Sequence, residues 1–192
     1  GNVYRTVVIG DQNWMAENLK VTKYRNGDNI TNITGSSGWG SDTSGAYGVY
    51  VSSEIDATTY LDSYGLLYNW YAVGNSSGIC PEGWHVPTRI EYDDLEDEVG
   101  LEPGGKLKET GIEHWRSPNT GATNSSGFSA RGNGFRYAGN GTYSSIKSYT
   151  YTWSGTSSGG KAYYRRLAYN TTNLNEYLIN KNYGFGVRCL ED

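Results

Sequence analysis

Two cysteines, Cys80 and Cys189, constrain this chain most, because they are its only ones. They lie 189 − 80 = 109 positions apart, and neither belongs to a CxxC pair. A zinc cage would need both cysteines and both histidines, His85 and His114, at irregular spacing. A disulfide is therefore the favoured prediction, and two buried free thiols are the alternative. Closing so long a loop stabilises a fold by up to about 4.7 kcal/mol in the chain-entropy model. A persistent disulfide also predicts an oxidising, extracytoplasmic compartment.

Composition predicts a β-rich fold with a core built from rings. Only 36% of the residues are apolar and 19% are charged, while there are 27 glycines, 18 tyrosines and 6 tryptophans. Tyr and Trp bury large areas but keep a polar atom that needs a partner, which suits short strands better than a helix bundle. The length fits one domain with a sizeable core. We therefore expect a single α+β, β-rich domain over residues 1–192.

Charge and hydropathy exclude two classes of function. The net charge is −4 and the basic residues are scattered, with Arg165-Arg166 as the densest pair. Nucleic-acid binding needs a concentrated basic face, so we expect none. No apolar run approaches the roughly 20 residues that cross a bilayer, so we expect no transmembrane segment. The chain begins at Gly1 rather than Met, which leaves room for an upstream segment such as a lipid anchor.

The first half of the chain predicts a hairpin and then a long loop. Strands over residues 3–9 and 13–19 flank a turn at Gly10-Asp11. Residues 25–63 are rich in Gly, Ser, Thr and Asn, and we interpret them as a loop excursion within the domain.

The strongest helix signal spans residues 88–99. Thr88 and Glu91 have the spacing of a capping box, and the apolar residues that follow recur on one helical face. Gly100 supplies the stop. The apolar segment 66–73 fits either a short strand or a short helix.

After Gly127 the pattern becomes β. The expected strands are 128–131, 135–137, 149–153, 161–169, 174–179 and 183–190, with a tight turn at Gly132-Asn133-Gly134 between the first two. In the last strand, Phe185, Val187 and Cys189 alternate onto one face. Cys189 is thus expected to point inward, toward the segment before the helix.

Several motifs recur in the order of a known family. They are Trp14–Leu19, Tyr64–Trp70, Cys80–Thr88, Gly127–Ala130, Gly134–Tyr137, Trp153-Ser154, Ala162–Tyr164 and Gly184–Cys189. Together they resemble the Fibrobacter succinogenes major paralogous domain, a family found on secreted and lipid-anchored bacterial surface proteins. The resemblance implies an extracellular or cell-surface location.

A more distant resemblance concerns the fold. Residues 83–92 resemble the helix-opening motif of the sulfatase-modifying (formylglycine-generating) family, and residues 184–188 resemble its closing strand. Those enzymes share the C-type lectin-like fold, so the resemblance implies that fold here, with long irregular loops. They also use a pair of neighbouring cysteines. This chain has no such pair to spare, so we expect no oxidase. No other catalytic set stands out in the sequence, so we expect no other enzyme activity either.

Metal chemistry has little support in the sequence. The calcium-binding triplets of sugar-binding C-type lectins are missing, since Ser117-Pro118-Asn119 lacks the carboxylate and Glu102-Pro103-Gly104 lacks the amide. We expect no cofactor. The alternative is a structural calcium held by loop carbonyls, because such ligands leave little trace in a sequence. The acidic run at residues 93–98 is interpreted as a solvated helix face, with a cation site or a pair of catalytic carboxylates as the alternative. His85 is expected to make a structural hydrogen bond, and His114 to lie on a loop surface.

Aromatic residues in neighbouring strands are the best candidates for binding. Alternation places Tyr149, Tyr151 and Trp153 on one face, and flat rings stack on the apolar faces of sugars while polar groups bond the rim. The alternative is that these rings form the core. The candidate ligand-binding residues are Tyr149, Tyr151, Trp153, Tyr163, Tyr164, Arg165, Arg166 and Asn170. The sequence thus predicts a non-catalytic secreted or cell-surface module that binds a glycan, with protein–protein adhesion or surface assembly as the alternative.

Overall fold

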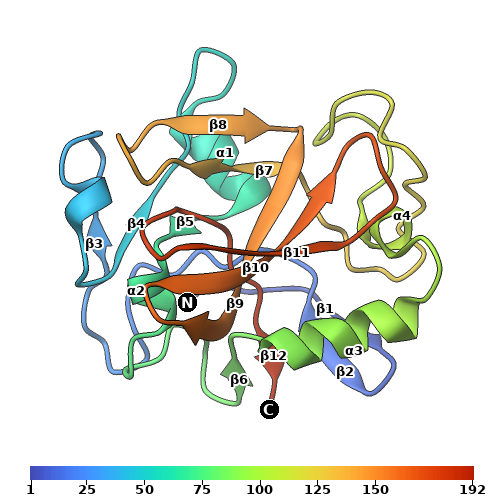
Figure 1. Cartoon of the computed structure of the whole chain (residues 1–192), viewed down its shortest axis with the longest axis horizontal. Coiled ribbons are helices and arrows are strands. Elements are labelled where there is room, and N and C mark those ends of the chain that lie inside the picture. Colours follow the sequence, from blue (N-terminus) through green and yellow to red (C-terminus); the bar gives the residue numbers. More distant parts are fainter.

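The computed structural model describes residues 1–192 as a β-rich molecule with several small sheets and few helices (Figure 1). One antiparallel sheet has the strand order β1 (Thr6–Ile9), β2 (Gln12–Met15), β12 (Leu190–Glu191) and β6 (Trp84–His85). A second, also antiparallel, has the order β11 (Asn175–Asn180), β10 (Lys161–Ala168) and β9 (Tyr149–Ser158). The remaining strands are β3 (Thr31–Asn32), β4 (Ala46–Gly48) and β5 (Leu67–Tyr68) in one sheet, and β7 (Asn133–Arg136) with β8 (Tyr143–Ile146) in another.

The helices are short and lie in the segments that connect the strands. They are α1 (Ala57–Tyr64), α2 (Trp70–Val73), α3 (Arg89–Val99), α4 (Pro103–Leu107) and one 3-10 turn, η1 (Trp39–Ser41). The helix predicted at 88–99 is confirmed, with Thr88 as N-cap, a complete capping box with Glu91, and Gly100 as C-cap. The apolar segment 66–73 holds both β5 and α2, because Asn69 ends the strand and its side chain caps the helix. No helix has the length and apolar character needed to span a bilayer.

The two ends of the chain meet in the first sheet. The predicted hairpin forms as β1 and β2, and the final strand β12 lies between β2 and β6. Cys80 and Cys189 are joined by a disulfide with their Cα atoms 6.0 Å apart, and no cysteine is free. The Cys189 carbonyl also accepts a 3.0 Å hydrogen bond from the Met15 amide. The disulfide prediction is confirmed, and the free-thiol and zinc alternatives are wrong.

The core is made largely of rings. Four of the six tryptophans, Trp14, Trp39, Trp115 and Trp153, are fully buried. Two of their indole nitrogens bond to backbone: Trp115 donates to the Ala130 carbonyl and Trp153 to the Tyr68 carbonyl, at 2.9 and 2.8 Å. Rings with a polar atom can fill such a core because short strands and loops leave carbonyls free to accept.

Residues 25–63 form an integral part of this fold. The segment contains β3, η1, β4 and most of α1. The fully buried guanidinium of Arg136 holds it in place, donating to the carbonyls of Ile33, Gly35 and Gly141. Its Cζ lies 4.1 Å from the centre of the Trp39 ring. One buried cation thus anchors the part of this segment around residues 33–39, and strand pairing through β4 holds the part that follows.

The turn predicted at Gly132-Asn133-Gly134 is wrong. Asn133 instead begins β7, which pairs with β8 rather than with residues 128–131. Its buried amide bonds both the N–H and the C=O of Tyr151, at 2.8 and 3.0 Å. An asparagine side chain can imitate a strand backbone when a neighbouring strand offers both groups. Turn propensity alone does not reveal that use.

His114 was expected on a loop surface, and this expectation is wrong too. Its side chain is only 12% exposed, and Nδ1 lies 2.6 Å from a carboxylate oxygen of Glu109. Glu109 also accepts two hydrogen bonds from Arg131, at 3.0 and 2.8 Å. Burial would raise the pKa of Glu109, but the hydrogen bonds from His114 and Arg131, together with their charges, hold that pKa below its usual value.

This lowered pKa predicts that the stability of the fold falls at acidic pH. The Glu109 carboxylate stabilises the fold fully above its unfolded pKa of about 4.3, and this contribution disappears as the pH falls through the lower folded value. Glu109→Gln should therefore lower the melting temperature at neutral pH, by the equivalent of about 1–3 kcal/mol. The gap from the unmodified protein should narrow below about pH 4. Calorimetric scans of both proteins across this range test it, and a gap independent of pH would contradict it.

Candidate functional site

The β11–β10–β9 sheet has two faces of different character. In β10 the side chains alternate, so Tyr163, Arg165 and Leu167 share one face and Ala162, Tyr164, Arg166 and Ala168 share the other. The cross-strand pairs Tyr164↔Tyr177 and Tyr164↔Trp153 extend the second face onto β11 and β9. The residues predicted as one binding site are therefore divided between opposite sides of the sheet.

The first face is packed beneath α3. Arg165 is buried there and bonds to the carboxylates of Asp93, Glu96 and Glu176. Arg89 pairs with Glu176 at 2.7 Å, and its Cζ lies 5.1 Å from the centre of the Tyr163 ring. Part of the acidic run thus forms ion pairs that dock α3 on the sheet. Arg165 is engaged in this packing and Tyr163 is held against α3, so neither reaches the opposite face.

The side chains of the second face that lie closest to the sheet are part of the core. Trp153 is fully buried, and Tyr151 and Tyr164 are 9% and 7% exposed. All three rings pack around Phe185, with centroid distances of 4.4, 5.1 and 4.7 Å respectively. Burial raises the pKa of Tyr164 to about 12, so its hydroxyl stays protonated at neutral pH. These rings form the floor of the face, and they offer a ligand almost no surface.

Above this floor lies a group of more accessible side chains, which we call the ring face. Its centre is Arg166, whose Cζ lies 5.2 Å from the ring centre of Tyr149 and 4.6 Å from that of Tyr177. Arg166 Nη2 donates to the Tyr177 hydroxyl at 2.7 Å. The Nε of Arg166 is buried and has no hydrogen-bond partner. The guanidinium is therefore held between two rings by a single hydrogen bond.

Neighbouring segments widen the ring face. Tyr177 stacks on Tyr164 at 5.5 Å, while Phe135 lies 5.1 Å from Tyr151 and 6.0 Å from Tyr183. Tyr183 in turn meets Tyr137 edge-on at 5.5 Å. The ring face thus consists of Phe135, Tyr137, Tyr149, Arg166, Tyr177 and Tyr183. Tyr137 and Tyr177 are its most open members, at 42% and 38% exposed.

Sequence reasoning found only part of this surface. Tyr149 and Arg166 were predicted and lie on the ring face, whereas Phe135, Tyr137, Tyr177 and Tyr183 were missed. The alternation of Phe135 with Tyr137 in one segment was the available signal, but nothing in it indicates contact with Tyr183. Asn170 is exposed in the turn after β10, beyond the end of the strand.

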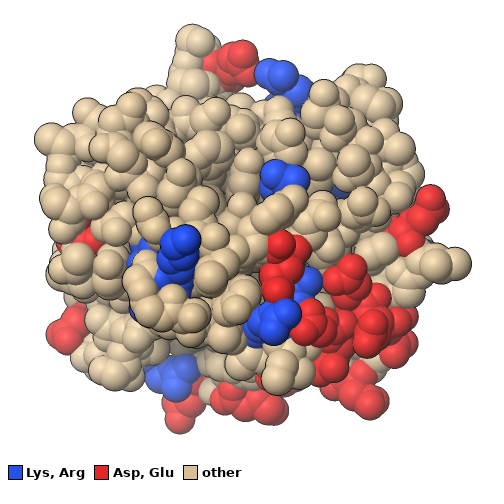
Figure 2. All heavy atoms as spheres, viewed as in Figure 1, with Lys and Arg blue, Asp and Glu red and all other residues tan.

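The ring face is a platform rather than a pocket. The five principal cavities of the molecule are lined by other residues. Figure 2 shows few charged side chains over the region of β8, β9 and β10, with acidic residues gathered over α3. No group of three or more His, Cys, Asp or Glu side chains is arranged to hold a metal ion. His85 lies between the carboxylates of Glu91 and Asp192, at 2.9 and 2.7 Å.

Comparison with protein-family models gives one match, the Fibrobacter succinogenes major domain, over residues 7–191. The chain belongs to this family. Comparisons with curated proteins and with solved structures gave no significant match. In this Fibrobacter succinogenes major domain, several side chains from the matching motifs are buried, among them Trp14, Asn69 and Arg188. Of the ring-face residues, Phe135 and Tyr137 belong to one of those motifs, while Tyr149, Arg166 and Tyr177 lie outside them. Membership in the family therefore does not by itself assign this whole surface.

Proposed function

We propose that this chain is a non-catalytic binding module that recognises a glycan chain through its ring face. The observation that carries the proposal is the half-buried Arg166, held between Tyr149 and Tyr177 with one hydrogen bond, to the Tyr177 hydroxyl. Rings supply flat apolar contact and phenol or guanidinium groups supply hydrogen bonds, and sugar binding needs both. A phenol hydroxyl can both donate and accept a hydrogen bond.

The flatness of the ring face favours an extended ligand. A small molecule is usually held in an enclosed pocket of roughly 300–1,000 Å³, and the ring face provides none. A polysaccharide chain can lie across the separated rings of Tyr137, Tyr149 and Tyr177. The exposed members of the ring face are tyrosines, each with a polar atom that can bond a sugar hydroxyl. Tyr and Arg are also common at protein interfaces, so a protein partner is the second candidate.

The proposed location is the cell surface or the extracellular space. The Cys80–Cys189 disulfide supports it, because such bonds persist in oxidising compartments. We also propose a C-type lectin-like fold. The placement of β12 beside β2, which joins the two ends of the chain in one sheet, supports that relationship.

A glycan array followed by calorimetry on the purified domain tests the proposal. With the polysaccharide that the array selects, Tyr177→Ala and Tyr149→Ala should each weaken binding about tenfold, because each removes a ring contact of roughly 1–2 kcal/mol. Tyr163→Ala is the matched control, since it removes a tyrosine from the opposite face of the same sheet. Its affinity should stay within about twofold of the unmodified protein.

Two results would overturn the glycan proposal. One is the absence of binding to every polysaccharide on the array, with and without calcium. The other is equal weakening by the Tyr163 control and the two ring-face variants. Self-association that Tyr177→Ala abolishes would instead support protein–protein assembly.

A further inference from the structure

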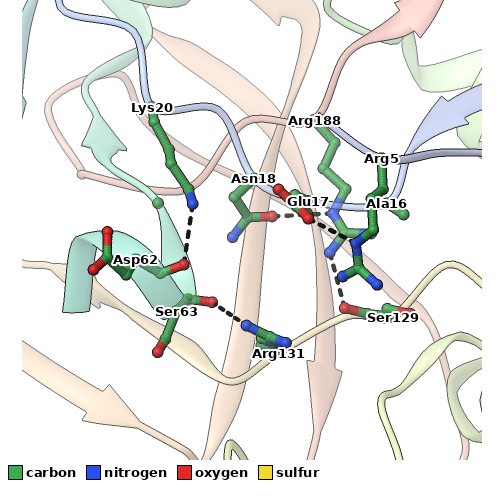
Figure 3. A pocket seen from close by; sticks show the side chains of 11 residues that line it. Arg5, Ala16, Glu17, Asn18, Lys20, Asp62, Ser63, Ser129, Arg131 and Arg188 are labelled. Atoms are coloured by element: carbon green, nitrogen blue, oxygen red, sulfur yellow. Dashed lines mark hydrogen bonds and ion pairs between the residues drawn. The ribbon is translucent and has the colours of Figure 1, made fainter. Parts of the chain in front are cut away.

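A second surface feature, which shares no residue with the ring face, is a polar cavity lined by four basic side chains. These are Arg5, Lys20, Arg131 and Arg188, and we call the space they line the arginine cavity (Figure 3). Its volume is about 90 Å³, and Ala16 is the one apolar residue in its lining. This space is large enough to hold a small polar group.

Arg188 is the most unusual of the four. It is 2% exposed, and no carboxylate pairs with it. Its guanidinium donates to the side-chain oxygen of Asn18 at 3.0 Å and to the carbonyls of Phe128 and Ser129. A guanidinium has five N–H groups, so each terminal nitrogen of Arg188 keeps one donor unused.

The charge of Arg188 is poorly compensated. Its pKa is lowered to about 9, chiefly by burial; the like charges of Arg131 and Arg5 act in the same direction, and Tyr92 and Glu17 act in the opposite one. Buried cations are ordinarily paired with an anion, because an unpaired one loses its hydration without replacement. The structure thus holds a positive charge in a place where an anion would be stabilising.

The neighbouring carboxylates leave the cavity with a positive balance. Glu17 is paired with Arg5 at 2.7 Å, and Arg131 with Glu109 at 2.8 Å. Lys20 donates to the backbone carbonyl of Asp62 at 3.0 Å.

Figure 3 shows the Asp62 carboxylate turned away from the guanidinium groups. Lys20 and Arg188 both line this cavity and donate only to neutral acceptors. The Glu17 carboxylate also lines it, but its charge is matched by Arg5.

We propose that the arginine cavity binds a single oxyanionic group, a carboxylate or a sulfate. The planar donors of a guanidinium match both groups in geometry, and an ammonium adds a point charge. Lys20 and the two unused donors of Arg188 would make the new contacts. The site shares no residue with the ring face, so it stands whether or not that face binds a glycan.

Nuclear magnetic resonance of the whole chain tests this with sodium sulfate and sodium acetate as probes. Sodium chloride at matched ionic strength is the reference. The side-chain Nε–H signal of Arg188 and the amide signal of Ser129 should shift and saturate, with a dissociation constant of roughly 1 mM. Saturation by one probe alone assigns the site to that chemistry, and saturation by both assigns it to either.

Variants decide whether the shifts come from this cavity. Lys20→Gln should raise the dissociation constant about tenfold, and Lys20→Arg should restore most of the affinity. Lys161→Gln, at the exposed β9–β10 turn, is the control and should change nothing. These positions avoid the buried Arg188, so the variants are expected to fold. Shifts that do not saturate by about 100 mM, or that survive unchanged in Lys20→Gln, would overturn the proposal.

Discussion

Replacing both cysteines by alanine should lower the melting temperature by about 10–20 °C. The disulfide closes a loop of 109 residues. Without it the unfolded chain gains conformational entropy, which stabilises the unfolded state by up to about 4.7 kcal/mol. For a domain of this size, each kcal/mol corresponds to about 2–4 °C. The bridge joins the loop before β6 to the residue before β12, so its loss acts where the two ends of the chain meet.

Differential scanning calorimetry of the Cys80→Ala/Cys189→Ala variant measures this effect. Reductant should lower the melting temperature of the unmodified protein toward that of the variant and leave the variant itself unchanged. A variant that melts within about 2 °C of the unmodified protein would show that native contacts, rather than the crosslink, hold the two ends together.

The second large effect is expected at Trp153. Trp153→Ala should cost about 3–5 kcal/mol, because it empties the space of a fully buried indole. It also leaves the Tyr68 carbonyl without the 2.8 Å hydrogen bond that Nε1 donates, and it removes the contact with Phe185 at 4.4 Å. Trp153→Phe keeps much of the ring and loses the donor, so it should cost less, about 1–3 kcal/mol. Chemical denaturation of both variants measures the two costs.

This pair of variants also separates a core role from a binding role. If Trp153 is core, the folded fraction of either variant should bind the selected polysaccharide as the unmodified protein does. The Tyr177→Ala variant should show the reverse, with stability kept and affinity reduced. A stable Trp153→Ala protein that had lost its binding would contradict the assignment of this ring to the floor of the sheet.

The sequence predicted best those features that depend on local chemistry. Thr88, Glu91 and Gly100 specify the ends of α3 through contacts within a few residues, and the structure has all of them. The cysteine pair also needed little tertiary information, because only one partner was available to each. The failures lie where distant segments meet. Asn133 was expected in a turn because its flanking glycines permit one, but a neighbouring strand uses its amide as a backbone substitute.

The sequence by itself determined the family, the β-rich class, the disulfide and the helix α3, because motif order, composition and capping are properties of the chain. It also showed that Tyr149, Tyr151 and Trp153 share one side of a strand, because side chains alternate along any strand. Only the tertiary structure decided which of these rings meet solvent. Phe185 and Phe135 cover Tyr151 and Trp153, while Tyr149 stays near the surface beside Arg166. Burial depends on which other segments pack against a strand, and the sequence of the strand alone does not indicate which segments those are.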